Sequence, residues 1–128
     1  SAHPDVEAQY LALTEDLAQL GILYLHLLDH SAMGAPAVPA EFKFRLRVAF
    51  QGLFILAGGF DRAGAESALN AGHADLIAFA RPFIANPDLV VRLQTKAALN
   101  ALDMATLYTP GSAGYTDYPR VSAYRLAP

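Results

Sequence analysis

The chain has 128 residues, enough for one ordinary domain, and it contains no cysteine, which excludes disulfides, thiolate metal sites and a cysteine nucleophile. Its formal net charge is −3 and its nine Lys and Arg residues form no run, so we expect no nucleic-acid partner. The sequence shows neither an apolar stretch of membrane-spanning length nor a signal-peptide pattern at its start. We therefore expect a cytoplasmic protein without a membrane partner.

The hydrophobic content is unusual. Hydrophobic residues make up 54% of the chain and charged residues 16%, whereas typical soluble domains contain about 45–50% and about 25%. The apolar runs lack the alternation of apolar and polar residues that is typical of a strand with one solvent-exposed face, so both faces of such strands must be buried. Either helices cover both faces of the sheet, or the chain is part of something larger.

Secondary structure is predicted from hydrophobic spacing, from prolines that suit a first helical turn and from glycines that end helices. In chain order the predicted elements are a helix over 4–20, a strand over about 22–27, a helix over 40–50, a strand over 53–57, a helix over 62–71, a strand over 76–80, a short helix over 86–93 and an irregular tail over 103–128. Strands that alternate with helices pair in parallel through right-handed crossovers. The prediction is an α/β fold in which residues 1–128 form a single segment. Its three-stranded parallel sheet has long apolar edges that favour pairing with another sheet or another copy.

Two predicted strand ends carry groups that suit an anion. Gly58 and Gly59 follow the second predicted strand, while Ala80 and Arg81 end the third. Ligands of parallel α/β proteins bind at the carboxyl ends of strands, where glycines let backbone N–H groups approach a phosphate and an arginine adds a fixed charge. The alternative is a tight strand-to-helix turn beside a surface arginine, and the spacing leaves both interpretations open. The chain has no GxGxxG or Walker lysine motif.

Other polar and aromatic residues also allow two interpretations. His26, Asp29 and His30 cluster at the end of the first predicted strand, where they are compatible with a metal or acid/base site or with a backbone-bonded histidine and a polar loop. The rings of the tail tyrosines either stack on a planar ligand or pack to hold the tail. These tyrosines are Tyr108, Tyr115 and Tyr118.

Longer motifs resemble one known family. The segments AGGFD at 57–61, ADLIAFARPFIANPDL at 74–89 and GYTDYP at 114–119 strongly resemble the C-terminal part of the old yellow enzyme family. YLHL at 24–27 and DHSAMG at 29–34 resemble its sixth strand and the loop that follows. The similarity covers essentially the whole chain, and the phrase IANPDL is its most specific part.

The resemblance implies an FMN-dependent reductase on a (β/α)8 TIM barrel that passes hydride from NAD(P)H to the alkene of an enone-type substrate. It implies that Gly58, Gly59, Arg81 and the backbone of Ala80 hold the FMN phosphate, and that Tyr108 lines the substrate side of the flavin. The family usually has glycine at the position of Ala80. It assigns no catalytic residue and no metal ligand to this chain, because the proton donor and the substrate-anchoring residues of the much longer family enzymes have no counterpart here.

The resemblance therefore implies the last three βα units of such a barrel, a partial barrel completed by self-association or by a missing N-terminal part. We expect the chain to supply the FMN phosphate site and to have little or no reductase activity alone. Two alternatives remain. One is a non-catalytic half-barrel module that dimerises through its exposed sheet edges, and the other is a different barrel enzyme that acts on a phosphorylated metabolite.

Overall fold

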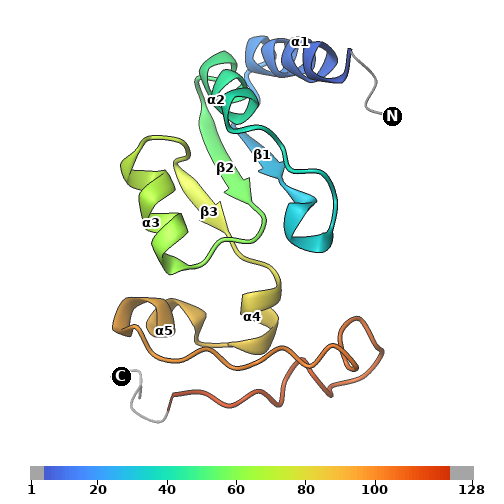
Figure 1. Ribbon diagram of the computed structural model, residues 1–128, viewed down its shortest axis with the longest axis vertical. Coiled ribbons are helices and arrows are strands. Elements are labelled where there is room, and N and C mark those ends of the chain that lie inside the picture. The colour runs from blue at the N-terminus through green and yellow to red at the C-terminus, as the bar shows by residue number, and fades with distance from the viewer. Residues whose placement is uncertain (1–4, 122–128) are drawn as a thin grey trace. The chain divides into compact units, whose positions relative to one another are not determined.

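The computed structural model describes residues 5–121, and Figure 1 shows the chain as a ribbon. The chain divides into two compact units, residues 1–78 and residues 79–128. The first unit contains α1 (Val6–Gln19), β1 (Tyr24–Leu28), the 3-10 helix η1 (His30–Met33), α2 (Ala40–Ala49), β2 (Leu53–Ala57), α3 (Arg62–Asn70) and β3 (Leu76–Ala78). The second contains α4 (Arg81–Ala85) and α5 (Leu89–Thr95), followed by turns and irregular backbone up to Val121. The predicted start of the first helix at Pro4 and tail residues 122–128 lie outside the described residues.

Three parallel strands form the sheet of the first unit, in the order β1-β2-β3. A connection that contains a helix joins each strand to the next, which confirms the predicted parallel α/β arrangement. Leu28 at the end of β1 pairs with Ala57 at the end of β2, and Ala57 pairs with Ala78 at the end of β3. The three carboxyl ends therefore finish level with one another. β3 is shorter than the predicted strand over 76–80, because its partner β2 ends at Ala57.

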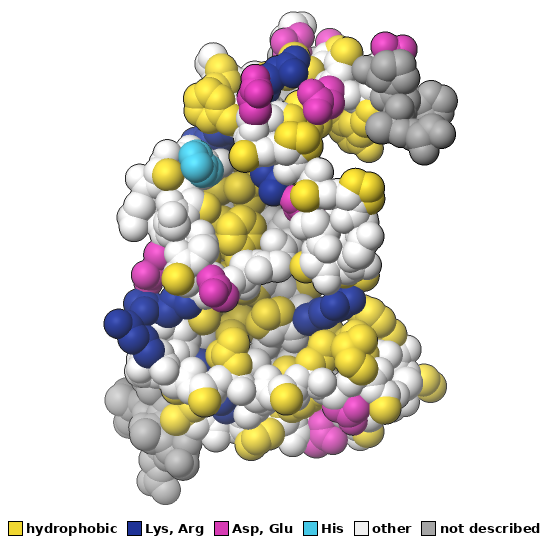
Figure 2. All heavy atoms as spheres, in the orientation of Figure 1, with side chains coloured by type: hydrophobic (Ala, Val, Ile, Leu, Met, Phe, Trp, Pro, Cys, Tyr) yellow, Lys and Arg dark blue, Asp and Glu magenta, His cyan; other side chains and the backbone are white. Residues whose placement is uncertain are grey.

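Side chains of the sheet alternate between two faces, and the helices cover one of them. The covered face contributes Leu25, Leu27, Phe54, Leu56 and Ile77, which belong to one core with Phe42, Leu46 and Phe50 from the α2 region and with Leu11 and Leu17 of α1. The opposite face carries the exposed side chains of Tyr24, Leu28, Leu53 and Leu76. Exposed apolar side chains also occur widely on the surface that Figure 2 shows. Burying one such side chain is worth about 1.5–3 kcal/mol, so the opposite face is suited to a further layer.

Glycines end α1 and α3 with the same backbone geometry. Gly21 follows α1 at φ 72°, and the N–H of Ile22 donates to the carbonyl of Leu17, in the pattern of a Schellman motif. Gly72, also at φ 72°, ends α3 in the same way. Because the N–H of Ile22 closes α1, β1 begins only at Tyr24, two residues later than the prediction.

In the second unit, the prediction of one short helix over 86–93 is wrong. α4 ends at Ala85 and α5 begins at Leu89, so two helices flank this point. Asn86 follows α4, and its side-chain amide donates to the carbonyl of Pro82 at 2.9 Å. Pro87 cannot donate a backbone hydrogen bond and separates the two helices. Pro82 lies in the first turn of α4, a position that proline tolerates well. Because residues 76–80 were predicted to form one strand, the start of α4 at Arg81 was not predicted.

Candidate functional site

The carboxyl end of β2 leads into a two-glycine turn that packs against the residues after β1. Gly58 and Gly59 have φ angles of 119° and 66°, which favour glycine. A Cβ on Gly58 would lie 2.0 Å from the carbonyl oxygen of Asp29, and a Cβ on Gly59 would lie 3.0 Å from the Cβ of Ala32. The packing of the protein itself therefore requires glycine at position 58, so this glycine alone does not indicate a ligand.

Asp29, the residue after β1, organises the polar contacts at this strand end. Its buried carboxylate accepts the N–H groups of Ser31 at 2.9 Å and Val38 at 3.3 Å, and it pairs with Nζ of Lys43 at 2.5 Å. Its own N–H donates to the carbonyl of Ala57 at 2.9 Å. Burial raises the pKa of Asp29, but hydrogen bonds from Lys43 and Ser31 and the Lys43 charge outweigh burial and lower the pKa to about 2. The charged carboxylate thus holds the η1 loop beside the glycine turn at neutral pH.

Asp29 and His26 are two of the three candidate metal ligands near the end of β1. Asp29 is engaged with Lys43 and the loop backbone, and His26 is exposed on β1. Within residues 5–121, no group of three or more His, Asp or Glu side chains is arranged to hold a metal ion. The helices in this described range are also too short or too polar to cross a membrane.

α3 begins directly after the glycine turn. The carboxylate of Asp61 accepts the N–H of Gly64 at 2.7 Å and so caps the helix. Arg62 and Glu66 form an i,i+4 ion pair at 2.7 Å, as expected for a solvated helix face. The helix dipole of α3 places positive potential at its amino end, next to the glycine turn in the chain, although the Asp61 cap already uses one of its N–H groups.

Ala80 and Arg81 follow β3 in the chain and belong to the second unit, which begins at residue 79. Ala80 is the exposed residue before α4, and Arg81 is the half-buried first residue of that helix. Four arginines form ion pairs with Asp or Glu side chains, namely Arg45, Arg47, Arg62 and Arg92. Among the described residues, Arg81 has no such partner, so no neighbouring carboxylate in this range competes with an anion for its guanidinium.

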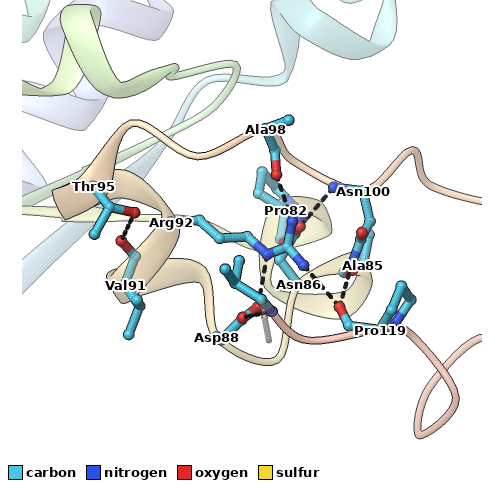
Figure 3. A network of polar contacts seen from close by, with 11 residues as sticks. Pro82, Ala85, Asn86, Asp88, Val91, Arg92, Thr95, Ala98, Asn100 and Pro119 are labelled. Atoms are coloured by element: carbon cyan, nitrogen blue, oxygen red, sulfur yellow. Dashed lines mark hydrogen bonds and ion pairs between the residues drawn. The ribbon is translucent and has the colours of Figure 1, made fainter. Parts of the chain in front are cut away.

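The IANPDL motif begins a buried polar network inside the second unit, shown in Figure 3. Arg92, which is 6% exposed, donates from Nε to Asp88 at 2.7 Å, from Nη2 to the Pro119 carbonyl at 2.8 Å, and from Nη1 to the Ala98 carbonyl. The other carboxylate oxygen of Asp88 accepts the N–H of Val121 at 2.7 Å. The hydrogen bond from Arg92 is the main cause that lowers the pKa of Asp88. The network therefore ties α5 to the tail.

Two asparagines complete this network. The side-chain oxygen of Asn86 accepts the N–H of Asn100 at 2.7 Å, and the amide of Asn100 donates to the carbonyls of Ala85 and Pro119 at 2.8 Å each. Sequence reasoning identified the motif as specific but did not find this role. The structure gives the motif a positioning role, because its polar groups are directed into the second unit and hold the tail (Figure 3).

Tyr108, predicted to line the substrate side of a flavin, is 72% exposed and has a left-handed backbone with φ 62°. Its N–H donates to the hydroxyl of Tyr115 at 2.8 Å. The hydroxyl of Tyr118 accepts the N–H of Asp103 at 2.8 Å. Tyr115 and Tyr118 therefore help to hold the tail, whereas Tyr108 exposes its ring.

Comparisons with known proteins identify the family. A model described as the NADH:flavin oxidoreductase / NADH oxidase family matches residues 12–100, a range that includes both strand-end segments but not Tyr108. The chain is 40% identical over 126 residues to 12-oxophytodienoate reductase 2 of Arabidopsis thaliana, and the aligned region covers 96% of this chain and 34% of that protein. It is 38% identical over 115 residues to a 12-oxophytodienoate reductase-like protein of Solanum lycopersicum, which covers 88% of this chain and 31% of that protein.

Solved structures agree with this similarity. Morphinone reductase matches with a TM-score of 0.85 and 39% identity, covering 94% of this chain and 33% of that chain. A structure of morphinone reductase in complex with tetrahydroNAD matches with a TM-score of 0.85 and 37% identity, covering 95% and 32%. The chain thus spans about a third of the length of these relatives. Because the family model matches more than half of the chain, the resemblance to the old yellow enzymes is confirmed, and the chain belongs to the NADH:flavin oxidoreductase / NADH oxidase family.

Proposed function

We propose that this chain supplies the FMN phosphate site of a reductase that transfers hydride from NADH or NADPH to the alkene of an electron-poor, enone-type substrate. The support is its family, whose description names NADH and flavin, and its similarity to proteins named 12-oxophytodienoate reductase and morphinone reductase. One of the similar structures is a complex with tetrahydroNAD. The chain spans about a third of these relatives, so we assign the complete reaction to a complete barrel.

The proposed phosphate ligands are the backbone N–H groups of Gly58 and Gly59, the backbone of Ala80 and the guanidinium of Arg81. The observation that carries this proposal is that Arg81 has no acidic partner among residues 5–121 while it follows a strand that ends level with β2. A half-buried guanidinium that has no acidic partner suits a phosphate dianion by charge and by hydrogen-bonding geometry. The left-handed glycine turn at the end of β2 leaves its backbone without Cβ atoms, which also suits close approach of a phosphate.

When bound, FMN supplies redox chemistry that the side chains of this chain do not provide. The residues of the chain bind and orient: the strand-end segments hold the phosphate, and the exposed ring of Tyr108 contacts the substrate. We assign no catalytic residue and no metal ligand to the chain. We therefore expect little or no reductase activity from it alone.

We further propose that the chain is a partial (β/α)8 barrel whose exposed sheet face is covered in the functional protein. Tyr24, Leu28, Leu53 and Leu76 on this face support the proposal, because exposed apolar side chains of parallel strands favour cover by another layer. The cover is either a second copy or an N-terminal part of the barrel. Sedimentation of the chain at micromolar concentration distinguishes these two kinds of cover, because a monomeric mass would contradict self-association. Flavin uptake and NADPH oxidation restored by a separately expressed N-terminal part of a relative would support completion by that part.

Replacing Arg81 with alanine tests the phosphate site. We expect the Kd for FMN, measured by flavin fluorescence, to rise about tenfold to a hundredfold, because a charge-assisted hydrogen bond contributes about 1.5–3 kcal/mol. Arg62→Ala is the matched control, since Arg62 pairs with Glu66 on α3. Equal losses in the two variants would show that Arg81 is not at the phosphate.

A further inference from the structure

The tail holds one exposed aromatic residue in a conformation that costs free energy. Tyr108 has φ 62° and an exposed fraction of 72%, so burial of its ring does not offset its left-handed backbone. Residues with a side chain rarely adopt this region, and those that do are held there by their surroundings and are common at functional sites. The contacts of the Tyr108 backbone therefore indicate what holds the ring outward.

The Tyr115 hydroxyl is one such contact. It accepts the N–H of Tyr108 at 2.8 Å, seven residues away along the chain. The next residue, Thr109, donates from its N–H at 3.3 Å and from its hydroxyl at 2.8 Å to the carbonyl of Thr106. The two bonds from Thr109 close a tight turn around Tyr108, whereas the Tyr115 hydroxyl accepts the Tyr108 N–H from outside that turn.

Tyr115 is itself held by the other residues of the GYTDYP motif. The N–H of Gly114 donates to the carboxylate of Asp117 at 2.8 Å, and a Cβ on Gly114 would lie 2.1 Å from the hydroxyl oxygen of Thr106. The Pro119 carbonyl at the end of the motif accepts hydrogen bonds from Arg92 and Asn100, as described above. The motif therefore runs as an anchored segment beside the Tyr108 turn.

We propose that Tyr115 is a positioning residue, whose hydroxyl fixes the Tyr108 backbone so that the exposed ring lies against a planar enone-type substrate. This inference rests on the proposed function, because Tyr108 contacts substrate only if the chain serves a flavin-dependent reductase. The GYTDYP motif thereby has a physical role. Its Pro119 carbonyl is bonded to the buried network, and its Tyr115 hydroxyl holds the Tyr108 backbone in place.

The test compares Tyr115→Phe with Tyr118→Phe in the full chain. Both substitutions remove one hydroxyl that accepts a backbone N–H, but the Tyr118 hydroxyl accepts that of Asp103. By NMR, the amide of Tyr108 is expected to exchange with solvent about fivefold to tenfold faster in Tyr115→Phe and at the wild-type rate in Tyr118→Phe, because one hydrogen bond is lost at that amide. An unchanged exchange rate in Tyr115→Phe would overturn the inference.

The second measurement uses the FMN-saturated chain and cinnamaldehyde, a planar unsaturated aldehyde, as the probe. The Kd for the probe, followed by the flavin spectrum, is expected to rise about fivefold in Tyr115→Phe while the Kd for FMN is unchanged. Unchanged probe affinity, or an equal loss of FMN affinity, would reduce Tyr115 to a general packing role and overturn the proposal. If the wild-type chain takes up no FMN, both Kd values are measured after the N-terminal part of a relative has been added, and absence of FMN uptake there too would make the proposed function and the substrate part of this inference fail together. The exchange rates then still decide whether Tyr115 holds Tyr108.

Discussion

Replacing Gly58 with alanine should destabilise the protein without any ligand present. The new Cβ would lie 2.0 Å from the carbonyl oxygen of Asp29, at a φ of 119° that disfavours a side chain. The backbone conformation costs about 1–3 kcal/mol, and separating Asp29 from the turn weakens its 2.9 Å hydrogen bond to Ala57, worth about 0.5–1.5 kcal/mol. We expect the free energy of unfolding, measured by urea titration with circular dichroism, to fall by about 2–4 kcal/mol.

Gly72→Ala provides the matched control. Gly72 also has a positive φ, 72°, but a Cβ there would meet no atom within 4 Å. Its substitution carries only the left-handed strain, about 1–2 kcal/mol. The difference between the variants therefore measures the contact with Asp29. Equal losses in Gly58→Ala and Gly72→Ala would refute the close approach of the glycine turn to the end of β1.

Two further predictions concern charged groups. Asp29 has a folded-state pKa of about 2 against an ordinary value of 3.8, so its charge stabilises the fold above about pH 4 and this contribution is lost as pH falls toward 2. The shift corresponds to at most about 2.5 kcal/mol, or about 1 kcal/mol after discounting for the partly exposed Lys43. The free energy of unfolding should be measured for the wild type and for Asp29→Asn across this pH range. The difference between the two proteins should shrink as the pH falls, and a constant difference would contradict the lowered pKa of Asp29. Arg92→Met should make the tail about tenfold or more sensitive to limited proteolysis, because three hydrogen bonds from the guanidinium are lost. Arg45→Met, at an exposed pair with Glu7, should change little, and equal sensitivity of the two variants would argue against the buried network.

The sequence by itself determined the order of the main helices and strands of the first unit and the chemistry of their ends. Hydrophobic spacing predicted parallel strands alternating with helices, and Gly21, Asp61 and Gly72 stand at the ends of these helices. These signals are local, because a helix cap or a strand pattern depends on residues a few positions apart. Family motifs at the two strand ends were likewise readable as contiguous segments.

Only the tertiary structure decided which distant groups meet. Asp29, a candidate metal ligand from its neighbours in sequence, pairs with Lys43 fourteen residues away. Asp88 receives the N–H of Val121 from thirty-three residues away, which gives the IANPDL motif its role in holding the tail. Local pattern does not specify such partners, because packing brings them together only after the backbone has folded, and burial then gives their hydrogen bonds and charges their strength.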